Sequence, residues 1–435
     1  MKIVLIHPPH PNSTDDRLDP PLGLLYISSY LKQYGINVEI KDLSEKYLST
    51  EHSIFKNKSS KILDIDCIPF ADIYGIVVYI SSIDITKQIV SFCRSINPNC
   101  KIVVGGAHPS SCPYDFPYVD HVVVGAGEVA MYDIITGVIQ AHIIIGTEPD
   151  NYFLFPSYDL IDPHSYHRKI EGNISLPILT SRYCPFKCSF CGLSKMHKLG
   201  NTVRMDSPEN VYYNIKRIKD DFGIDRINFQ DDIFTLNPDR LFKILDLIKP
   251  LNIKFRCMGR AGYDTEQTYE KLSEAGCSDI AWGIESGSQY ILDRMNKQVK
   301  VRDNYNVIQW AKKYGITSRA FFIIGFPGET VNTIEDTKKF IELSDPDQYF
   351  VSSFIPYPGT DVGDNPSKYG IINKSLDYNQ YFQISKNGLG GLTIDTEWLS
   401  KNDFRDLEIQ FREWINKREM RGSLQDYEKE KIWKN

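Results

Sequence analysis

Hydrophobic and polar residues alternate regularly over the first 145 residues. Short runs rich in Val and Ile are separated by stretches with apolar residues at helical spacing, such as "PLGLLYISSYLKQYG", which ends at Gly35. Strands that alternate with helices in this way predict a parallel sheet covered on both faces. We therefore expect a doubly wound, Rossmann-like α/β domain over residues 1–145. Its strands are expected in "KIVLIHPP", "NVEIKDL", "YGIVVYIS", "KIVVGGA" and "HVVVGAGE".

The alternation resumes at residue 176, after an interruption. Residues 146–175 contain three prolines and many aromatic residues with little periodicity, which predicts an ordered linker. Six apolar runs with helical patterns between them follow over residues 176–360. A complete eight-stranded barrel takes about 250 residues, so we expect a partial (β/α)6 barrel, TIM-like and open on one side. The six runs are "PILTSR", "RINFQDD", "IKFRCMG", "DIAWGIES", "RAFFIIG" and "QYFVSSFIP".

Residues 361–435 predict a small, mainly helical C-terminal segment. In "DFRDLEIQFREWINKREM" acidic and basic residues are interleaved, which favours a solvated amphipathic helix.

Three strand ends of the first domain carry glycine and small polar residues, in "HPPHPNS", "GGAHPS" and "GAGE". Ligands of such sheets bind outside the carboxyl ends of the strands, and glycine lets the backbone approach a ligand closely. These ends therefore predict a ligand crevice, although each alone fits a tight turn. No G-x-G-x-x-G follows the first strand, which argues against NAD or FAD. The crevice residues are Gly105, Gly106, His108, Gly125, Gly127 and Glu128, and His7 and His10 are expected at its edge as hydrogen-bonding loop residues.

Polar residues also follow the strands of the second domain. In a parallel barrel the carboxyl ends of all strands form one face, which is the catalytic face. Chemistry-bearing residues at every strand end predict an active-site mouth there, with helix caps and salt bridges as the alternative for any single one. The residues are Cys184, Asp231, Asp232, Arg260, Glu285, Ser286 and Gly325.

The stretch "TSRYCPFKCSFCG" places Cys184, Cys188 and Cys191 at C-x3-C-x2-C spacing. Thiolates at this density bind metal. A Cys3His zinc site completed by His197 is one alternative. An iron–sulfur cube held by three cysteines is the other, and it leaves one iron open to a ligand that is not protein.

The composition of the chain limits its possible partners and its location in the cell. The chain has 435 residues, 42% of them hydrophobic, and a net charge of −6. A negative net charge does not predict binding to nucleic acid. No apolar run approaches the roughly 20 residues of a membrane span, and the N-terminus does not resemble a signal peptide. We expect a cytoplasmic protein. Six further cysteines are scattered and are expected as buried thiols.

The cysteine spacing after the first barrel strand, with Phe190 before the last cysteine, resembles the radical S-adenosylmethionine (SAM) enzymes. The layout from "PPLGLLYISSYL" and "VVVGAGE" to "FQDDIF", "GIESGS", "GFPGET" and "PYPGT" resembles their cobalamin-binding-domain subfamily over residues 1–360. The resemblance implies a [4Fe–4S] cluster on the three cysteines. It also implies that SAM chelates the fourth iron and is cleaved to a 5′-deoxyadenosyl radical.

The resemblance also assigns roles to single residues. Asp231 and Asp232 would lie near the methionyl amino group, and Glu285 and Arg260 near the ribose or carboxylate. Residues 323–329, with Gly325, would run along the adenine. Two features depart from the family pattern: the D-x-H-x-x-G motif is absent, and Ala126 stands where relatives often have Glu. Cobalamin remains the expected ligand of the first domain, with a corrin-free domain as the alternative.

The implied reaction is cobalamin-dependent methylation of an unactivated carbon in a small molecule, with cyclisation or oxidation as alternatives. An electron donor such as flavodoxin or ferredoxin would be the partner. A tRNA-modifying radical enzyme would need a basic terminal domain and further cysteine triads, which are missing. A non-catalytic metal protein would lack the polar strand ends.

Overall fold

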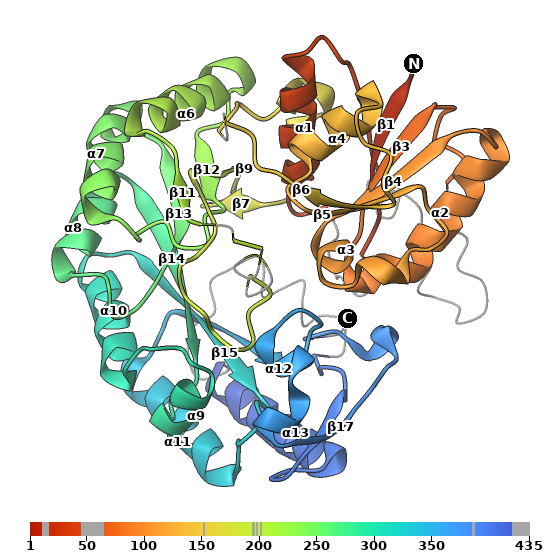
Figure 1. Ribbon diagram of the computed structural model, residues 1–435. Helices are drawn as coiled ribbons and strands as arrows, with labels where there is room; N and C mark the ends of the chain where they lie inside the picture. Colours follow the sequence, from red (N-terminus) through yellow and green to blue (C-terminus); the bar gives the residue numbers. More distant parts are fainter. Residues whose placement is uncertain are drawn as a thin grey trace.

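The computed structural model describes residues 1–10, 17–44, 65–150, 153–193, 196, 199–200, 202–384 and 388–419. Two α/β units lie side by side, the N-terminal one in red to yellow and the larger one in green to blue (Figure 1). The first contains a six-stranded sheet in the order β2-β1-β3-β4-β5-β6, with every pair parallel. The prediction of a doubly wound domain is confirmed, with β6 added. The strands are β1 Ile3–His7, β2 Glu39–Asp42, β3 Ile73–Val77, β4 Lys101–Gly105, β5 His121–Gly125 and β6 Ile143–Gly146.

Helices cover both faces of this sheet. Successive side chains of a strand point to opposite faces. Val4 of β1 packs in a core cluster with Ile89 of α2, whereas Leu5 packs in another with Leu25 of α1. The helices are α1 Leu22–Lys32, α2 Ile83–Ile96, α3 Ala107–Ser111 and α4 Glu128–Thr136, with 3₁₀ turns η2 Ile80–Ser82 and η3 Pro113–Asp115.

The linker is ordered where the structure describes it. Tyr158 and Tyr166 are buried, and the Tyr166 hydroxyl donates to Asp42 of β2 at 2.8 Å. The Tyr158 hydroxyl donates to the carbonyl of Pro177, at the start of the second unit. Its elements are η4 Tyr158–Leu160, η5 Pro163–Ser165, β7 Lys169–Ile170 and β8 Asn173–Ile174.

The second unit is the expected partial barrel. Its sheet has the order β9-β12-β13-β14-β15-β16, all parallel, and β9 and β16 form its two edges. Helices line the outside of this sheet (Figure 1). The strands are β9 Leu176–Ile178, β12 Arg226–Phe229, β13 Lys254–Gly259, β14 Cys277–Glu285, β15 Thr317–Ile324 and β16 Gln348–Ser353. The helices are α6 Pro208–Phe222, α7 Pro238–Ile248, α8 Glu266–Glu274, α9 Gln289–Arg294, α10 Val301–Lys313 and α11 Val331–Ser344, with η6 Lys249–Leu251; β10 Ser181–Arg182 and β11 Arg204–Met205 form a separate ribbon.

Side-chain caps fix the beginnings of the first two barrel helices. The Ser207 hydroxyl accepts from the N–H of Asn210, and the Asn237 side chain accepts from the N–H of Arg240. Proline follows each cap residue, where its missing N–H costs nothing. Helix α6 ends at Gly223 in the left-handed conformation, a common helix stop.

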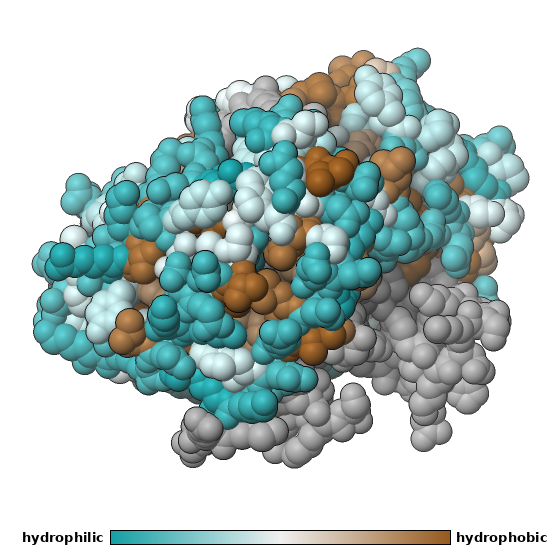
Figure 2. All heavy atoms as spheres, turned by 90° about the horizontal axis from the view of Figure 1, so that it is seen from below, coloured by the Kyte–Doolittle hydropathy of each residue, from teal (hydrophilic) through white to brown (hydrophobic). Residues whose placement is uncertain are grey.

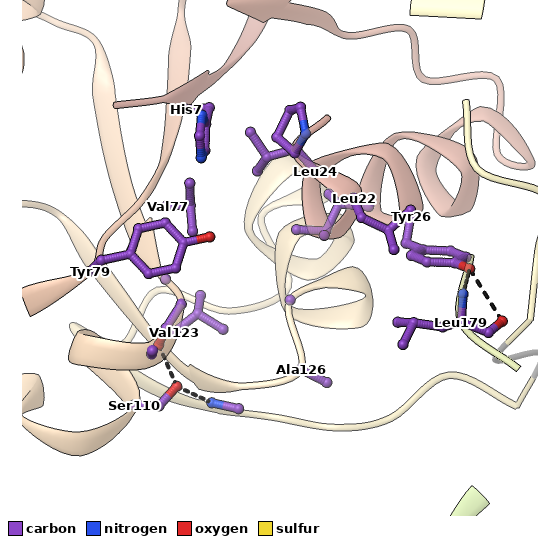
Figure 3. Close-up of a pocket in the computed structure, with 18 of the residues that line it drawn as sticks. His7, Leu22, Leu24, Tyr26, Val77, Tyr79, Ser110, Val123, Ala126 and Leu179 are labelled. Carbon is purple, nitrogen blue, oxygen red and sulfur yellow. Dashed lines mark hydrogen bonds between the residues drawn. The ribbon is translucent and has the colours of Figure 1, made fainter. Parts of the chain in front are cut away.

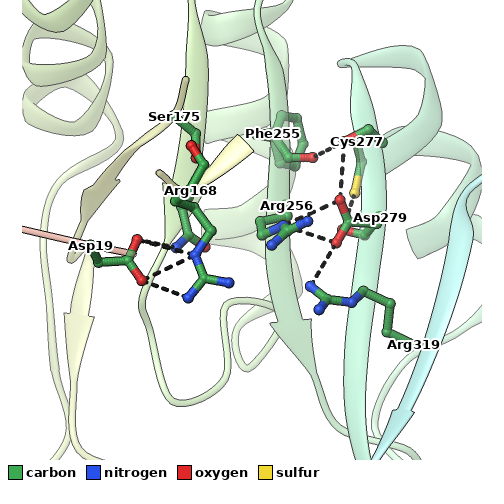
Figure 4. A network of polar contacts seen from close by, with 10 residues as sticks. Asp19, Arg168, Ser175, Phe255, Arg256, Cys277, Asp279 and Arg319 are labelled. Carbon is green, nitrogen blue, oxygen red and sulfur yellow. Dashed lines mark hydrogen bonds and ion pairs between the residues drawn. The ribbon is translucent and has the colours of Figure 1, made fainter. Parts of the chain in front are cut away.

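A layer of buried charge joins three neighbouring barrel strands. Asp279 of β14 forms ion pairs with Arg256 of β13, at 3.0 Å, and with Arg319 of β15, at 3.2 Å. Figure 4 shows this group beside the ion pair of Asp19 with Arg168, whose nearest atoms are 2.7 Å apart. That second pair connects the segment before α1 to the linker.

The C-terminal segment packs against the barrel, which corrects the expectation of a solvated helix. Helix α13 spans Lys401–Glu419, and Phe411 on it is fully buried. Glu408 is also fully buried and accepts from the Ser353 hydroxyl at 2.6 Å and from Arg412 at 3.0 Å. The remaining elements are α12 Asp361–Asp364, η7 Pro366–Tyr369, β17 Ile371–Lys374, η8 Tyr378–Gln380 and β18 Ile394–Thr396.

The face in Figure 2 is mainly hydrophilic, with hydrophobic residues in separate small patches. Such a distribution is ordinary for a water-exposed surface. In the part of the chain that the structure describes, no helix is long and apolar enough to cross a membrane.

Candidate active site

The three cysteines of the motif lie in the loop that follows β9 and β10. Cys188 is buried, and Cys184 and Cys191 are half-buried. Burial raises the pKa of Cys191 to about 11 and also raises that of Cys184. In the metal-free loop the thiols of Cys184 and Cys191 are therefore protonated, and metal binding would release their protons.

The spacing of the three sulfur atoms separates the two metal alternatives. Within the described ranges, only His108, Cys112 and Asp115 bring three ligand atoms within 4.8 Å of one another, so at least two of the three motif sulfurs lie more than 4.8 Å apart. A single zinc with bonds of about 2.3 Å cannot separate two sulfurs by more than about 4.6 Å. The loop fits a cluster of several metals better than one zinc. His197, the fourth ligand of the zinc alternative, lies outside the described residues.

Arg260 reaches the cysteine loop itself. Its guanidinium lies 3.6 Å from the centroid of the Phe186 ring, and its Nη1 is 3.8 Å from the Cys188 sulfur. Its Nη2 donates to the carbonyl of Lys297. Arg260 therefore contacts the cysteine loop, and the contact with the ribose or carboxylate of SAM that the family resemblance implies stays a prediction.

The two neighbouring aspartates differ in their surroundings. Asp231 is fully buried and accepts from the Thr180 N–H at 2.7 Å and from the Thr180 and Ser181 hydroxyls at 2.6 Å each. Its carboxylate is thus engaged with the protein. Asp232 is exposed at a cavity, yet desolvation and the nearby Asp231 raise its pKa to about 6.

The other predicted SAM residues make internal contacts. Glu285 pairs with Lys297 at 2.7 Å, and the buried Ser286 hydroxyl lies 3.2 Å from that of Thr337. Gly325 has a φ of +82°, and a Cβ there would lie 2.4 Å from the Phe404 ring of α13. Phe190 is partly buried against a small group of hydrophobic side chains that includes Phe326. Protein contacts alone thus hold these four side chains or backbone positions in place, with no ligand needed.

A cavity of about 1080 Å³ separates the two sheets. On the first-domain side it is lined by the predicted Gly105, Gly106, Gly125, Gly127 and Glu128, and on the barrel side by Cys191 and Asp232. Leu22, Leu24 and Tyr26 of α1 form one wall, opposite Val77 and Val123 of the sheet (Figure 3). The crevice expected at the strand ends thus reaches the cysteine loop.

The histidines near the first sheet are held by protein groups. His108 is absent from the cavity lining and its Nε2 lies 2.9 Å from Asp115, which does not support the predicted ligand contact. His7 and His10 do line the cavity. His7 Nδ1 lies 3.1 Å from Asp42. The pKa of His10 is lowered to about 4, mainly by burial and to a lesser extent by the neighbouring His7.

Comparison with known proteins follows this division of the chain. Residues 178–341 match the family model of the radical SAM superfamily, and residues 18–135 match that of the B12 binding domain. An uncharacterized methyltransferase of Pyrococcus horikoshii is 30% identical over 405 residues, which cover 86% of this chain and 84% of that protein. The chain belongs to the radical SAM enzymes that carry a cobalamin-binding domain. Both cofactor-binding domains of this group, for the [4Fe–4S] cluster with SAM and for cobalamin, are present.

More distant relatives of this radical SAM enzyme share its layout. The anaerobic magnesium-protoporphyrin IX monomethyl ester cyclase of Rubrivivax gelatinosus is 23% identical over 402 residues, covering 83% of this chain and 69% of that protein. The structure of the cobalamin-dependent radical enzyme OxsB with aqua-cobalamin and SAM bound has a TM-score of 0.70 at 19% identity, over 100% of this chain and 70% of that chain. That likeness shows a shared fold.

Sequence reasoning missed several residues at this radical SAM site. Tyr26, Arg182 and Tyr183 line the cavity, and Lys297 pairs with Glu285. Arg182 and Tyr183 directly precede Cys184, so proximity to the motif was the available signal. Their partners are far away in the sequence, and periodicity does not identify them.

Proposed function

We propose that this radical SAM enzyme methylates an unactivated carbon of a small molecule with the help of cobalamin. One observation carries the proposal: a single cavity is lined both by the glycine-rich strand ends of the first domain and by Cys191 and Asp232 of the barrel. A substrate or cofactor in that cavity can contact both domains at once. The methyltransferase of Pyrococcus horikoshii, similar over most of both chains, favours methyl transfer.

The cysteine loop fits an iron–sulfur cluster. Cys184, Cys188 and Cys191 would hold three irons, and a sulfur pair more than 4.8 Å apart suits a polynuclear cluster better than a single metal. The Arg260 guanidinium beside Cys188 would offset the negative charge of the bound thiolates. Asp232 is the carboxylate that would receive the ammonium group of SAM. When bound, the cluster would supply the electron that cleaves SAM, and cobalamin would supply the methyl group.

The first-domain side of the cavity fits a large, flat, mostly apolar group. The cavity exceeds the roughly 300–1,000 Å³ of common small-molecule pockets. At Gly105 an added Cβ would meet only Val123, at 3.7 Å, so a longer side chain there would take cavity space. Leu22 and Leu24 supply an apolar wall. This chain thus provides a large space with an apolar wall on the α1 side, in which a corrin would bind.

The alternative is a radical cyclase or oxidoreductase on the same site, as the cyclase of Rubrivivax gelatinosus suggests by its similarity. The release of S-adenosylhomocysteine separates the two. Methylation consumes one SAM as methyl donor and yields S-adenosylhomocysteine beside 5′-deoxyadenosine, whereas cyclisation yields 5′-deoxyadenosine alone. A flavodoxin or ferredoxin would deliver the electron in the cell.

The test starts with anaerobic purification and reconstitution with iron, sulfide and hydroxocobalamin. We expect retained corrin and, after addition of SAM and dithionite, both 5′-deoxyadenosine and S-adenosylhomocysteine. Cys184→Ala should lose the cluster, whereas Cys67→Ala, a cysteine of the first domain, should keep it. No 5′-deoxyadenosine from protein with an intact cluster would exclude radical chemistry. Failure to retain corrin would exclude cobalamin-dependent methylation.

A further inference from the structure

A buried ion pair connects the cavity wall of the first domain to the cysteine loop. The carboxylate of Glu128, the first residue of α4, lies 2.7 Å from the guanidinium of Arg182 on β10. The exposed fractions of the two side chains are 7% and 14%. Arg182 precedes Cys184 by two residues, and its guanidinium also lies 5.3 Å from the ring centroid of Tyr26 on α1. The residue therefore contacts α1 and α4, two of the helices that border the first-domain side of the cavity.

Two further contacts hold the same segment. The Tyr26 hydroxyl accepts from the backbone N–H of Leu179 at 3.2 Å (Figure 3). The Tyr183 hydroxyl donates to Glu148, just beyond β6. Residues 179–183 thus touch the first domain through side-chain contacts to α1, to α4 and to the residue just beyond β6.

The backbone of this segment needs such support. Tyr183 has a φ of +69°, a left-handed conformation that is unfavourable for any residue with a Cβ. Strained residues persist where surrounding contacts over-determine them. Here the first domain supplies those contacts at Tyr183 itself and at the residues before it, immediately ahead of the first cysteine.

We propose that Glu128 and Arg182 are positioning residues: their ion pair fixes the start of the cysteine loop against the cavity wall, and so sets the placement of Cys184. Burying two charges costs desolvation free energy, and such pairs serve best as registration devices between elements. The sequence analysis gave Glu128 a direct ligand contact. The proposal gives its carboxylate a protein partner instead, and it rests on the proposed function for the identity of the cluster.

The test uses the full chain, with a reconstituted [4Fe–4S] cluster but without cobalamin or substrate. Glu128→Gln removes one charge of the pair with little change of shape. Asp279→Asn is the matched control, because it breaks the ion pairs of Asp279 with Arg256 and Arg319, which are similarly buried and line neither the cavity nor the cysteine loop. Arg182→Lys and Arg182→Gln complete the set, since Lys keeps the charge. The measurements are iron content, the electron paramagnetic resonance spectrum of the reduced cluster with SAM, and the rate of 5′-deoxyadenosine formation.

Glu128→Gln and Arg182→Gln should keep their iron, alter the spectrum with SAM, and slow 5′-deoxyadenosine formation by about 10–100-fold, the loss typical of a small misplacement of reacting groups. Arg182→Lys should recover part of the loss, and Asp279→Asn should match wild type in spectrum and rate. A Glu128→Gln variant with the wild-type spectrum and rate overturns the proposal. An equal change in Asp279→Asn overturns it too, because a general response to the loss of a buried ion pair would explain both.

A separate measurement of retained hydroxocobalamin separates this inference from the proposed function. If Glu128→Gln loses corrin but keeps the wild-type cluster spectrum, Glu128 is a direct corrin contact and the positioning role is wrong. If wild-type protein makes no 5′-deoxyadenosine, the proposed function has failed instead. If the glutamine variants lose iron, the Arg182→Lys variant decides between the two explanations. A wild-type iron content and spectrum in Arg182→Lys support the positive charge as the positioning element. An iron loss equal to that of Arg182→Gln contradicts the proposal.

Discussion

Glu329 of the "GFPGE" turn should make the barrel less stable at alkaline pH. Its side chain is 1% exposed, and burial raises its pKa from 4.5 to about 8. The N–H groups of Gly325 and Phe326 donate to the carboxyl and oppose part of that rise. The folded protein therefore prefers the neutral acid, while the unfolded chain ionises at ordinary pH.

The sign and size follow from proton linkage. Because the folded-state pKa is raised, the favourable contribution is complete below pH 4.5 and is lost as the pH rises through 8. Each pH unit in that window costs about 1.4 kcal/mol, so the loss is about 2 kcal/mol at pH 6 and nearly 5 kcal/mol at pH 9. Glu329→Gln keeps an oxygen acceptor for the two N–H groups and cannot ionise. Relative to wild type, the variant should gain about 2–3 kcal/mol between pH 6 and pH 9.

Tryptophan fluorescence during urea unfolding measures this difference in the correct part of the molecule. All five tryptophans lie at position 282 or beyond, so their signal reports the barrel and the C-terminal segment. Glu335→Gln on α11, with a side chain 48% exposed, is the control and should run parallel to wild type. If the difference between Glu329→Gln and wild type stays constant from pH 6 to pH 9, the carboxylate is ionised in the folded protein. In that case the two N–H donors outweigh burial, and the reasoning is refuted.

Three further substitutions test the cavity, the aspartate pair and the tail. Gly105→Leu should lower hydroxocobalamin retention at least 10-fold while Gly105→Ala, with only ordinary contacts, keeps it; equal dialysis results would contradict the cavity as corrin site. Asp231→Ala strands three donors, so it should destabilise the barrel by about 3–5 kcal/mol in urea, and a loss below 1 kcal/mol would argue against the hydrogen bonds. Gly325→Ala should cost about 2–4 kcal/mol, because it adds a clash with Phe404 to its backbone strain, whereas Gly315→Ala, with φ +68° and no atom within 4 Å, should cost about 1 kcal/mol; equal costs would show that Phe404 yields freely.

The strands of both sheets could be predicted because their burial leaves a local signature. Parallel strands covered on both faces have continuous β-branched runs in their sequence, and every predicted run of the barrel overlaps a strand. Helix ends also have local causes, such as Gly223 after α6. The strand β6 escaped because its run, Ile143–Gly146, is short and its flanks carry no helical pattern on one side.

The site was less predictable because its decisive contacts are long-range. Asp231 and Asp232 are adjacent, so their side chains must point in different directions, but the sequence does not reveal which one meets Thr180 and Ser181. The same limit applies to the C-terminal helix. Interleaved charges on α13 indicate solvation, yet the partner of Glu408 is Ser353, 55 residues earlier in the chain. Only a fold can bring that hydroxyl to the buried carboxylate.

The residues shared by the cavity and the cysteine loop argue that the two domains form one functional unit. Leu179, Arg182 and Tyr183 all line the cavity, and all three contact the first domain just before Cys184. A barrel separated from the first domain would leave Tyr183 in a left-handed conformation without the contacts that now hold it. The loop would then relax toward ordinary backbone geometry and move Cys184. The cobalamin-binding domain therefore does more than provide a second cofactor pocket: it forms part of the support on which the cysteine loop is built.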